Sequence, residues 1–329
     1  MAAQEFMPRD EVVGGIRADI EQYEAERQKA FRDVLWRIPV FFGALLVLVA
    51  ILAYAFNSFA SPYEQWTSSP HVILYVLSLI AVYPVYLAAV RPASRLKRSF
   101  RERLLPIIFG FVEELHHANG KRPDSFDRLP RPATGSFDEG SFDDVVSGKY
   151  EGFPFELYET SLSVESGNSK TTVFKGIVVA FGCVAPFPGL LVAARKTGRG
   201  WSFSGDVPCA APLEAVASGL ADLDAAYEFQ TDNADAGRVL VEGKLGKVLQ
   251  WVNATWPGEP PRVALHGRDG FLLLPLDKEL FELPAISSPL DYKAHIEPMV
   301  ADLVTLLATA SLVRRAGAPD AEPAETPQS

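Results

Sequence analysis

Hydrophobic residues gather in two uncharged runs near the start of the chain. The first extends from Ile38 to Phe56 and the second from Val72 to Val90. Each has 19 residues, or about 28 Å at the helical rise, close to the roughly 30 Å hydrocarbon thickness of a bilayer. A buried helix of a soluble domain normally keeps a polar face at the helical period, and neither run has one. We therefore predict a transmembrane hairpin over residues 37–90, with spans at 38–56 and 72–90.

Amphipathic patterns flank the hairpin. Within residues 1–36, apolar positions recur at helical spacing after Asp10, a residue type that favours helix N-caps. After the second run, a stripe from Phe100 to Leu115 predicts another helix, and Pro106 should kink it. Our hypothesis is that these two helices leave the membrane side by side and pair as a stalk.

The pattern changes after the second amphipathic stripe. Residues 120–144 are dense in Pro, Gly, Ser and Asp, so we interpret residues 91–145 as a basic juxtamembrane helix followed by a linker. Alternating and β-branched residues then predict antiparallel strands, at 153–164, 171–181 and 189–198. The segment CVAPFPG should separate the last two of these strands.

The remaining pattern completes an α+β domain, mainly an antiparallel sheet with packed helices, over residues 146–315. It predicts a helix at 238–256, a hairpin with its turn at Gly267–Gly270, and a closing helix after Ser288. Asp302 and the short apolar stretch argue against a third span in that helix. The last residues, 316–329, read as a disordered acidic tail.

Charge is distributed unevenly along the chain. The formal net charge is −10, yet six basic residues follow the second span: Arg91, Arg95, Lys97, Arg98, Arg101 and Arg103. The loop between the spans, residues 57–71, has one Glu and no Lys or Arg. By the positive-inside rule, both termini of this multi-pass protein lie in the cytoplasm, and so does the α+β domain.

The same six residues could also contact anionic lipid head groups beside the bilayer. Topology alone already explains these residues, so lipid contact is the less favoured alternative. The rest of the chain is acidic, which argues against nucleic-acid binding because such proteins need a basic footprint.

Several short motifs carry a family resemblance. They are FELYE, VFKGIVVAF, FQTDNADAGRVL and LFELPAISSPLD, beginning at Phe155, Val173, Phe229 and Leu280. In this order after two spans, they resemble the bacterial membrane-protein family known as domain of unknown function 3137, over roughly residues 35–315. The resemblance implies a bacterial inner-membrane protein with a cytoplasmic α+β domain. It brings no activity, cofactor or catalytic residue.

Cofactor and metal motifs fail on inspection. The segment that begins at Gly237 has five residues before Gly243-Lys244, and Leu245 stands where a phosphate loop needs Ser or Thr. Glu113 and His117, beside His116, would share a face of the expected helix but lack a third metal ligand. We favour a polar helix end there, and we expect neither a cofactor nor a metal.

The two cysteines, Cys183 and Cys209, are 26 residues apart on the expected cytoplasmic side. That spacing and compartment support neither a disulfide nor a zinc site, so burial as small apolar residues is the expectation.

Three functional hypotheses remain. The first is a binding or scaffolding module with an unidentified protein partner, held at the membrane by the hairpin. The second is a membrane-tethered enzyme built from scattered acids: Asp206, Asp222 and Asp224. The third is a subunit of an oligomeric channel or transporter, in which Pro84 interrupts the second span and polar residues line a path: Tyr75, Ser78, Tyr83 and Tyr86. The first is preferred because no catalytic constellation and no intramembrane charge is evident, and a homo-oligomer is compatible with it.

Overall fold

The computed structural model describes residues 10–59, 69–167, 169–196, 212–255, 261–276, 284–285 and 287–318. These residues form two compact units. The helical unit contains the described residues up to Ile108 and those from 284 to 298. The sheet unit contains those from Phe109 to Leu276 and those from Met299 onward.

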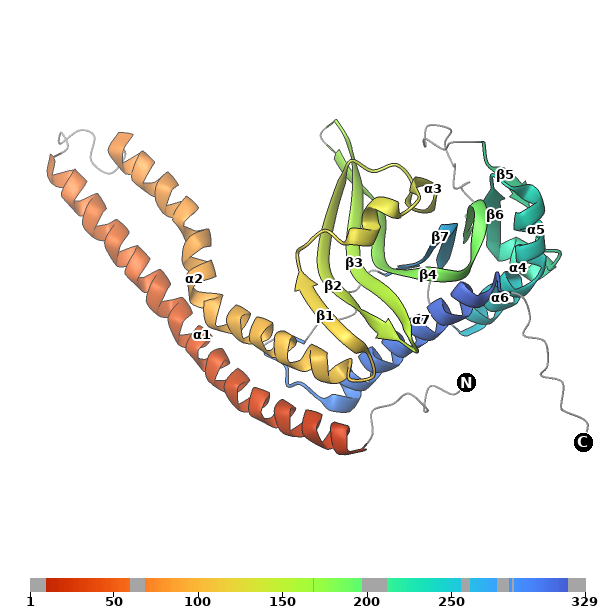
Figure 1. Cartoon of the computed structure of the whole chain (residues 1–329). Helices are drawn as coiled ribbons and strands as arrows, with labels where there is room; N and C mark the ends of the chain where they lie inside the picture. The colour runs from red at the N-terminus through yellow and green to blue at the C-terminus, as the bar shows by residue number, and fades with distance from the viewer. Residues whose placement is uncertain are drawn as a thin grey trace, which may run out of the picture. The chain divides into compact units, whose positions relative to one another are not determined.

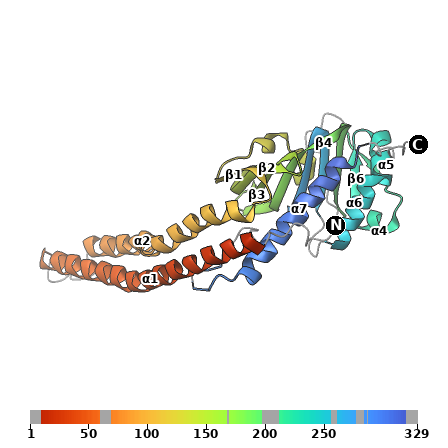
Figure 2. The ribbon, with the colours of Figure 1, turned by 60° about the horizontal axis from the view of Figure 1, so that its bottom comes forward.

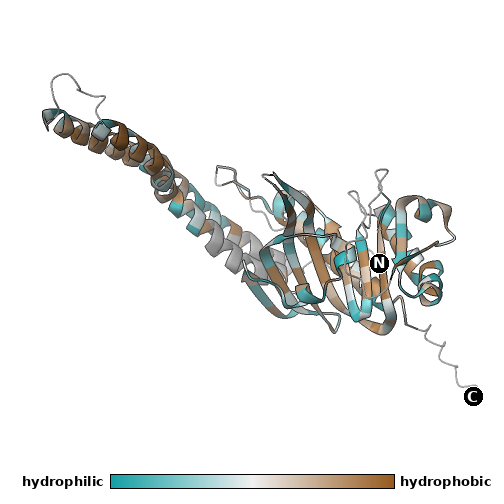
Figure 3. Cartoon of the chain, turned by 90° about the horizontal axis from the view of Figure 1, so that it is seen from above, coloured by the Kyte–Doolittle hydropathy of each residue, from teal (hydrophilic) through white to brown (hydrophobic). Residues whose placement is uncertain are grey.

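Two long helices make up most of the helical unit. They are α1 (Asp10–Phe59) and α2 (Ser69–Ile108), which run antiparallel and side by side (Figures 1 and 2). At the loop end, His71 Nε2 lies 2.9 Å from the carbonyl oxygen of Ala53. Both helices are long and apolar enough to cross a membrane, and only 6% of each apolar window is buried. The brown stretch of Figure 3 shows this apolar part, which supports membrane association.

The amphipathic stripe of α1 is buried inside the helical unit. Tyr23, Ala30 and Val34 are all buried. Beside them, Glu24 binds Arg27 at 2.8 Å and accepts a hydrogen bond from the backbone N–H of Leu290 at 2.7 Å. Charged segments of both helices line one cavity, so the helices stay paired just beyond their apolar runs. The stripe from Phe100 to Leu115, on which the stalk hypothesis depends, lies beyond this cavity.

The sheet unit is built on seven strands: β1 (Glu113–Asn119), β2 (Glu139–Tyr150), β3 (Phe153–Ser166), β4 (Ser169–Arg195), β5 (Glu214–Val216), β6 (Tyr227–Thr231) and β7 (Arg262–Pro275). Their order is β1-β2-β3-β4-β6-β5, and β7 pairs with β4. Every pairing is antiparallel. The α+β class with an antiparallel sheet and two apolar N-terminal helices is therefore confirmed.

Both faces of the central part of the sheet are covered, because side chains that point to opposite faces are equally buried. Tyr158 belongs to a core that also contains Phe174 and Phe271, and the adjacent Leu157 is just as inaccessible on the other face. Helix α7 (Glu297–Arg315), preceded by a turn of π-helix at Tyr292–Ile296, lies along that other face (Figures 1 and 2). Its apolar window is 61% buried, so packing accounts for its hydrophobic character.

The remaining helices are short and lie between strands. They are a 3₁₀ turn (Asp124–Arg128), α3 (Arg131–Thr134), α4 (Ala221–Ala226), α5 (Ala234–Glu242) and α6 (Lys244–Thr255). The helix expected over 238–256 is therefore two helices, which separate at Gly243. The closing helix is capped by Asp291, whose side chain accepts from the N–H of Ala294 at 2.8 Å, rather than by Ser288.

Two sequence predictions at the start of the sheet unit are wrong. The helix expected to reach Leu115 ends at Ile108, and residues 113–119 form strand β1 instead. Residues 120–144 are not a linker, because they contain the 3₁₀ turn, α3 and the first half of β2. β1 is an edge strand of mostly polar residues, and β2 buries little before Asp144, so neither shows an alternating apolar pattern.

The expected break and hairpin in the later strands are also absent. β4 continues through CVAPFPG as one strand, and β7 runs along it from Arg262 to Pro275 without turning back. The pairing register shifts between Gly182 and Phe187, opposite Gly267 and Asp269. Both turn-like segments therefore form a shared irregularity in the β4–β7 ladder, a role for which Gly and Pro are also suited.

Candidate functional site

A cavity of about 760 Å³ opens in the sheet unit where β4, α5, β7 and the end of α7 meet. Its lining comes from β4 (Cys183, Ala185, Pro186, Phe187 and Pro188), α5 (Asp235, Ala236, Val239 and Leu240), the α5–α6 junction (Gly243 and Lys244), β7 (Leu265) and the end of α7 with its following residues (Val313, Arg314, Ala316, Gly317 and Ala318). This volume is in the range of small-molecule sites, and most of the lining is apolar.

The irregular part of β4 shapes one wall. Pro186 and Pro188 lack the N–H that regular strand pairing requires, so this segment leaves the ladder. It is held by hydrogen bonds from the loop before α5. Asn233 Nδ2 donates to the Pro188 carbonyl at 2.7 Å, and Asp232 Oδ1 accepts from the N–H of Leu190 at 2.6 Å.

Helix α5 forms the opposite wall. Asn233 is its N-cap, and its side chain accepts from the N–H of Ala236 at 3.2 Å. From this fixed start, Val239 and Leu240 reach the cavity, and Val239 is 76% exposed. Val239 therefore adds accessible apolar surface to the concave wall of the cavity.

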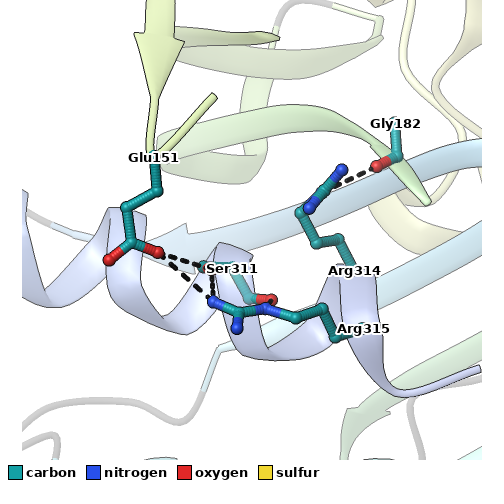
Figure 4. Close-up of polar contacts among 5 residues, drawn as sticks. All are labelled: Glu151, Gly182, Ser311, Arg314 and Arg315. Carbon is teal, nitrogen blue, oxygen red and sulfur yellow. Dashed lines mark hydrogen bonds and ion pairs between the residues drawn. The ribbon is translucent and has the colours of Figure 1, made fainter. Parts of the chain in front are cut away.

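Arg314 supplies positive charge at the cavity. Its Nε donates to the carbonyl of Gly182 at 3.2 Å (Figure 4). Its guanidinium lies 4.8 Å from the ring centre of Phe153. Burial, with the neighbouring charge of Arg315, lowers the pKa of Arg314 from its usual value. Within the described part of the chain, no carboxylate forms an ion pair with Arg314.

Arg315, the next residue, has a carboxylate partner. Arg315 binds Glu151 at 3.3 Å and also bonds to Ser311, which in turn bonds to Glu151 (Figure 4). The two adjacent arginines therefore differ in their electrostatic environment. The charge of Arg315 is balanced by Glu151, whereas Arg314 lines the cavity. Lys244 also lines the cavity, where its Nζ donates to the Ala318 carbonyl at 2.6 Å.

The cavity contains a thiol that is poorly suited to nucleophilic attack. Burial raises the pKa of Cys183 to about 11, Asp269 raises it further, and Arg314 opposes the shift. Cys183 is therefore protonated near neutral pH, and the thiolate is the reactive form. Asp235 is the one carboxylate among the lining residues. This arrangement can bind a ligand through apolar contact and through the positive charge of Arg314, with Lys244 and Asp235 as further charged groups of the lining.

The six basic residues chosen from the sequence lie elsewhere, on α2 of the helical unit. Arg91 and Arg95 are exposed and line a separate cavity between α1 and α2. For Lys97, Arg98, Arg101 and Arg103, the structure describes the helical backbone only.

The suspected metal ligands are not on a helix. Glu113, His116 and His117 belong to β1, where His117 Nε2 lies 2.8 Å from the fully buried Asp144. Asn119 Nδ2 donates to the same carboxylate oxygen at 3.3 Å. Among the described residues, no three His, Cys, Asp or Glu side chains are placed to hold a metal ion. The His117–Asp144 pair joins two strands.

The scattered acids do not converge within the described ranges. Asp222 and Asp224 lie in the first turn of α4, and Asp224 accepts from the N–H of Ser218 at 2.8 Å. Asp206 and Cys209 lie outside the described residues. In α2, Ser78 donates to the carbonyl of Tyr75 at 2.7 Å, within the helix itself.

No local sequence pattern indicates the cavity. Its walls come from segments near residues 185, 240 and 315, which only the folded sheet brings together. The paired prolines of β4 were the one available signal, and they were interpreted as a break between strands.

Comparisons with known proteins add little. No protein-family model and no curated protein matches the chain. Among solved structures, the chain is similar to the mycobacterial trehalose monomycolate transport factor A, TtfA, at 12% identity and a TM-score of 0.33. The match covers 65% of this chain and 93% of that one.

Proposed function

We propose that this protein is a membrane-anchored binding protein whose sheet unit takes an amphipathic ligand, with an apolar body and one anionic group, in the cavity between β4, α5 and α7. The observation that carries the proposal is Arg314, which lines a mostly apolar cavity together with Lys244 and has no described carboxylate partner. A partly desolvated guanidinium gains most from a carboxylate or phosphate that binds it directly.

The apolar wall sets the second requirement. Phe187, Val239 and Leu240 offer surface that a purely polar ligand would leave unfilled, whereas an alkyl or aromatic body would cover it. Asp235 and the protonated Cys183 thiol add polarity at the same cavity without supplying a nucleophile. Binding therefore suits this chemistry better than catalysis does.

The anchor and compartment form part of the same proposal. We place the protein in the bacterial inner membrane with both termini in the cytoplasm, as the charge pattern and the resemblance to domain of unknown function 3137 imply. The two apolar helices support membrane association. In this arrangement the sheet unit would meet ligands at the inner face of the membrane.

The test uses Cys183 as a reporter of occupancy. The full chain carrying Cys209→Ser is placed in lipid nanodiscs, and alkylation of Cys183 by N-ethylmaleimide is followed by mass spectrometry. Decanoate and decanol are compared, because they share an alkyl chain and differ in charge. Decanoate should slow alkylation at concentrations about 10-fold lower than decanol, the order of magnitude of one charge-assisted hydrogen bond.

Arg314→Gln should abolish this preference for decanoate, and Arg315→Gln is the matched control that should keep it. Equal protection by both compounds in the unmodified protein would refute the anionic part of the proposal. Absence of protection by either compound would refute the cavity as a site for alkyl ligands.

A further inference from the structure

The helical unit has its own cavity, of about 680 Å³, between α1 and α2. Four cations line it: Lys29 and Arg37 from α1, and Arg91 and Arg95 from α2. Glu26 and Asp33 are the acidic residues of the lining, so two positive charges remain in excess.

These four cations have no direct ion-pair partner among the described residues. No ion pair joins any of them to a described carboxylate, whereas the nearby Arg27 binds Glu24 at 2.8 Å. Like charges from two helices repel one another when they share one cavity. An anion placed among them would remove that repulsion.

The cavity lies at the end of the apolar segments. Arg37 directly precedes the uncharged run of α1, and Arg91 directly follows that of α2, so both mark the same membrane boundary. Phe41 and Ala88 extend the lining about one helical turn into the apolar side. One cavity therefore offers cations at head-group depth and apolar surface at acyl-chain depth.

Pro92 contributes to the opening between the helices. It lacks the N–H that would bond to the carbonyl of Ala88, and both residues line the cavity. α2 changes direction part-way along its length, as proline in a helix causes (Figure 1).

We infer that this cavity binds the head group of an anionic phospholipid, with its phosphodiester among Lys29, Arg37, Arg91 and Arg95. A topology signal requires basic residues on one side of the membrane, but it does not require them to converge on one cavity from both helices. Basic pockets between transmembrane helices on the cytoplasmic side are suited to anionic head groups. This inference is independent of the ligand proposed for the sheet unit.

The experiment is native mass spectrometry of the full chain, delipidated in detergent and titrated with phosphatidylglycerol or phosphatidylcholine. The unmodified protein should bind one phosphatidylglycerol at least 10-fold more tightly than phosphatidylcholine. Arg37→Gln and Arg91→Gln should each reduce that preference severalfold, and Arg91→Lys should keep most of it because the charge is retained.

Arg32→Gln is the matched control, since Arg32 lies on α1 but does not line the cavity. It should leave the preference within twofold. No preference in the unmodified protein, or an equal loss in Arg32→Gln, would overturn the inference. Displacement of the lipid by an equal concentration of glycerol 3-phosphate would also overturn it, because a soluble anion would then suffice.

Discussion

The backbone N–H of Leu190 donates a 2.6 Å hydrogen bond to Oδ1 of Asp232, which ties β4 to the loop that leads into α5. The two segments can approach this closely because Gly189, the residue before Leu190, has no side chain. A Cβ added at Gly189 would lie 2.2 Å from the same oxygen. This contact fixes two walls of the ligand cavity with respect to each other.

Asp232→Ala should therefore destabilise the sheet unit. The N–H of Leu190 is inside the fold, and leaving it without an acceptor costs about 1–3 kcal/mol. Asp232→Asn should cost less, since an amide oxygen can accept the same bond. Thermal melting of the full chain in nanodiscs, followed by near-ultraviolet circular dichroism, measures both, and equal melting temperatures for the two variants would contradict this reasoning.

A second prediction concerns the pairing of β4 with β7. A Cβ on Gly176 would lie 2.0 Å from the carbonyl oxygen of Leu274, and φ at Gly176 is +153°. Gly176→Ala should cost at least about 2 kcal/mol, because backbone rather than a flexible side chain must move.

Gly182→Ala, in the same strand, is the control, since a Cβ there meets nothing within 4 Å. The same melting experiment should show a loss of several degrees for Gly176→Ala and little change for Gly182→Ala. If the two variants melted together, the described β4–β7 register would be in error.

The third prediction is a pH profile. Because burial raises the pKa of Cys183 to about 11, its alkylation rate should rise about tenfold per pH unit from 7 to 10, without reaching a plateau. A plateau below pH 9 would contradict the burial of this thiol. Asp269→Asn should shift the profile to lower pH, because Asp269 is a source of the increase.

The raised pKa of Cys183 also predicts how the stability of the protein depends on pH. The folded state favours the protonated thiol, so this contribution is complete below the unfolded pKa near 8.5 and is lost as pH rises toward 11. Cys183→Ser should remove that part of the alkaline destabilisation, which melting at pH 7 and pH 10 would reveal.

The proposed topology can be tested with single cysteines in a background lacking Cys183 and Cys209. A membrane-impermeant maleimide applied to intact spheroplasts should label Cys placed at Ser58, near the loop end of α1, and not Cys placed at Arg32. The reverse pattern would place the basic flanks on the outer side and would refute cytoplasmic termini.

Much of the fold could be predicted from local patterns. The helices α1 and α2 follow from uncharged runs of 19 residues, and β3 and the two ends of β4 follow from alternating and β-branched residues. β1 and β2 could not be predicted in this way, because they are polar strands whose hydrogen bonds come from partners. Pairing is a non-local property, and it is absent from any short window of sequence.

In the candidate sites too, local features could be predicted from the sequence and non-local ones could not. Arg91 and Arg95 were found because charge density beside a span is a local signal. Their convergence with Lys29 and Arg37 depends on how two helices meet, and the charge at Arg314 depends on which arginine finds Glu151. Neither relationship could be read from spacing along the chain.

The length of β4 has a consequence for synthesis of the protein. Gly176 of β4 pairs with Pro275 of β7, so one edge of the central strand waits for a partner that is made roughly a hundred residues later. At about 5–20 residues per second, this edge stays open for roughly 5–20 s during translation. The stretch from Ile177 to Phe181 is apolar and is buried in the folded sheet, so it is uncovered only during that interval. An unpaired apolar edge favours aggregation of the nascent chain.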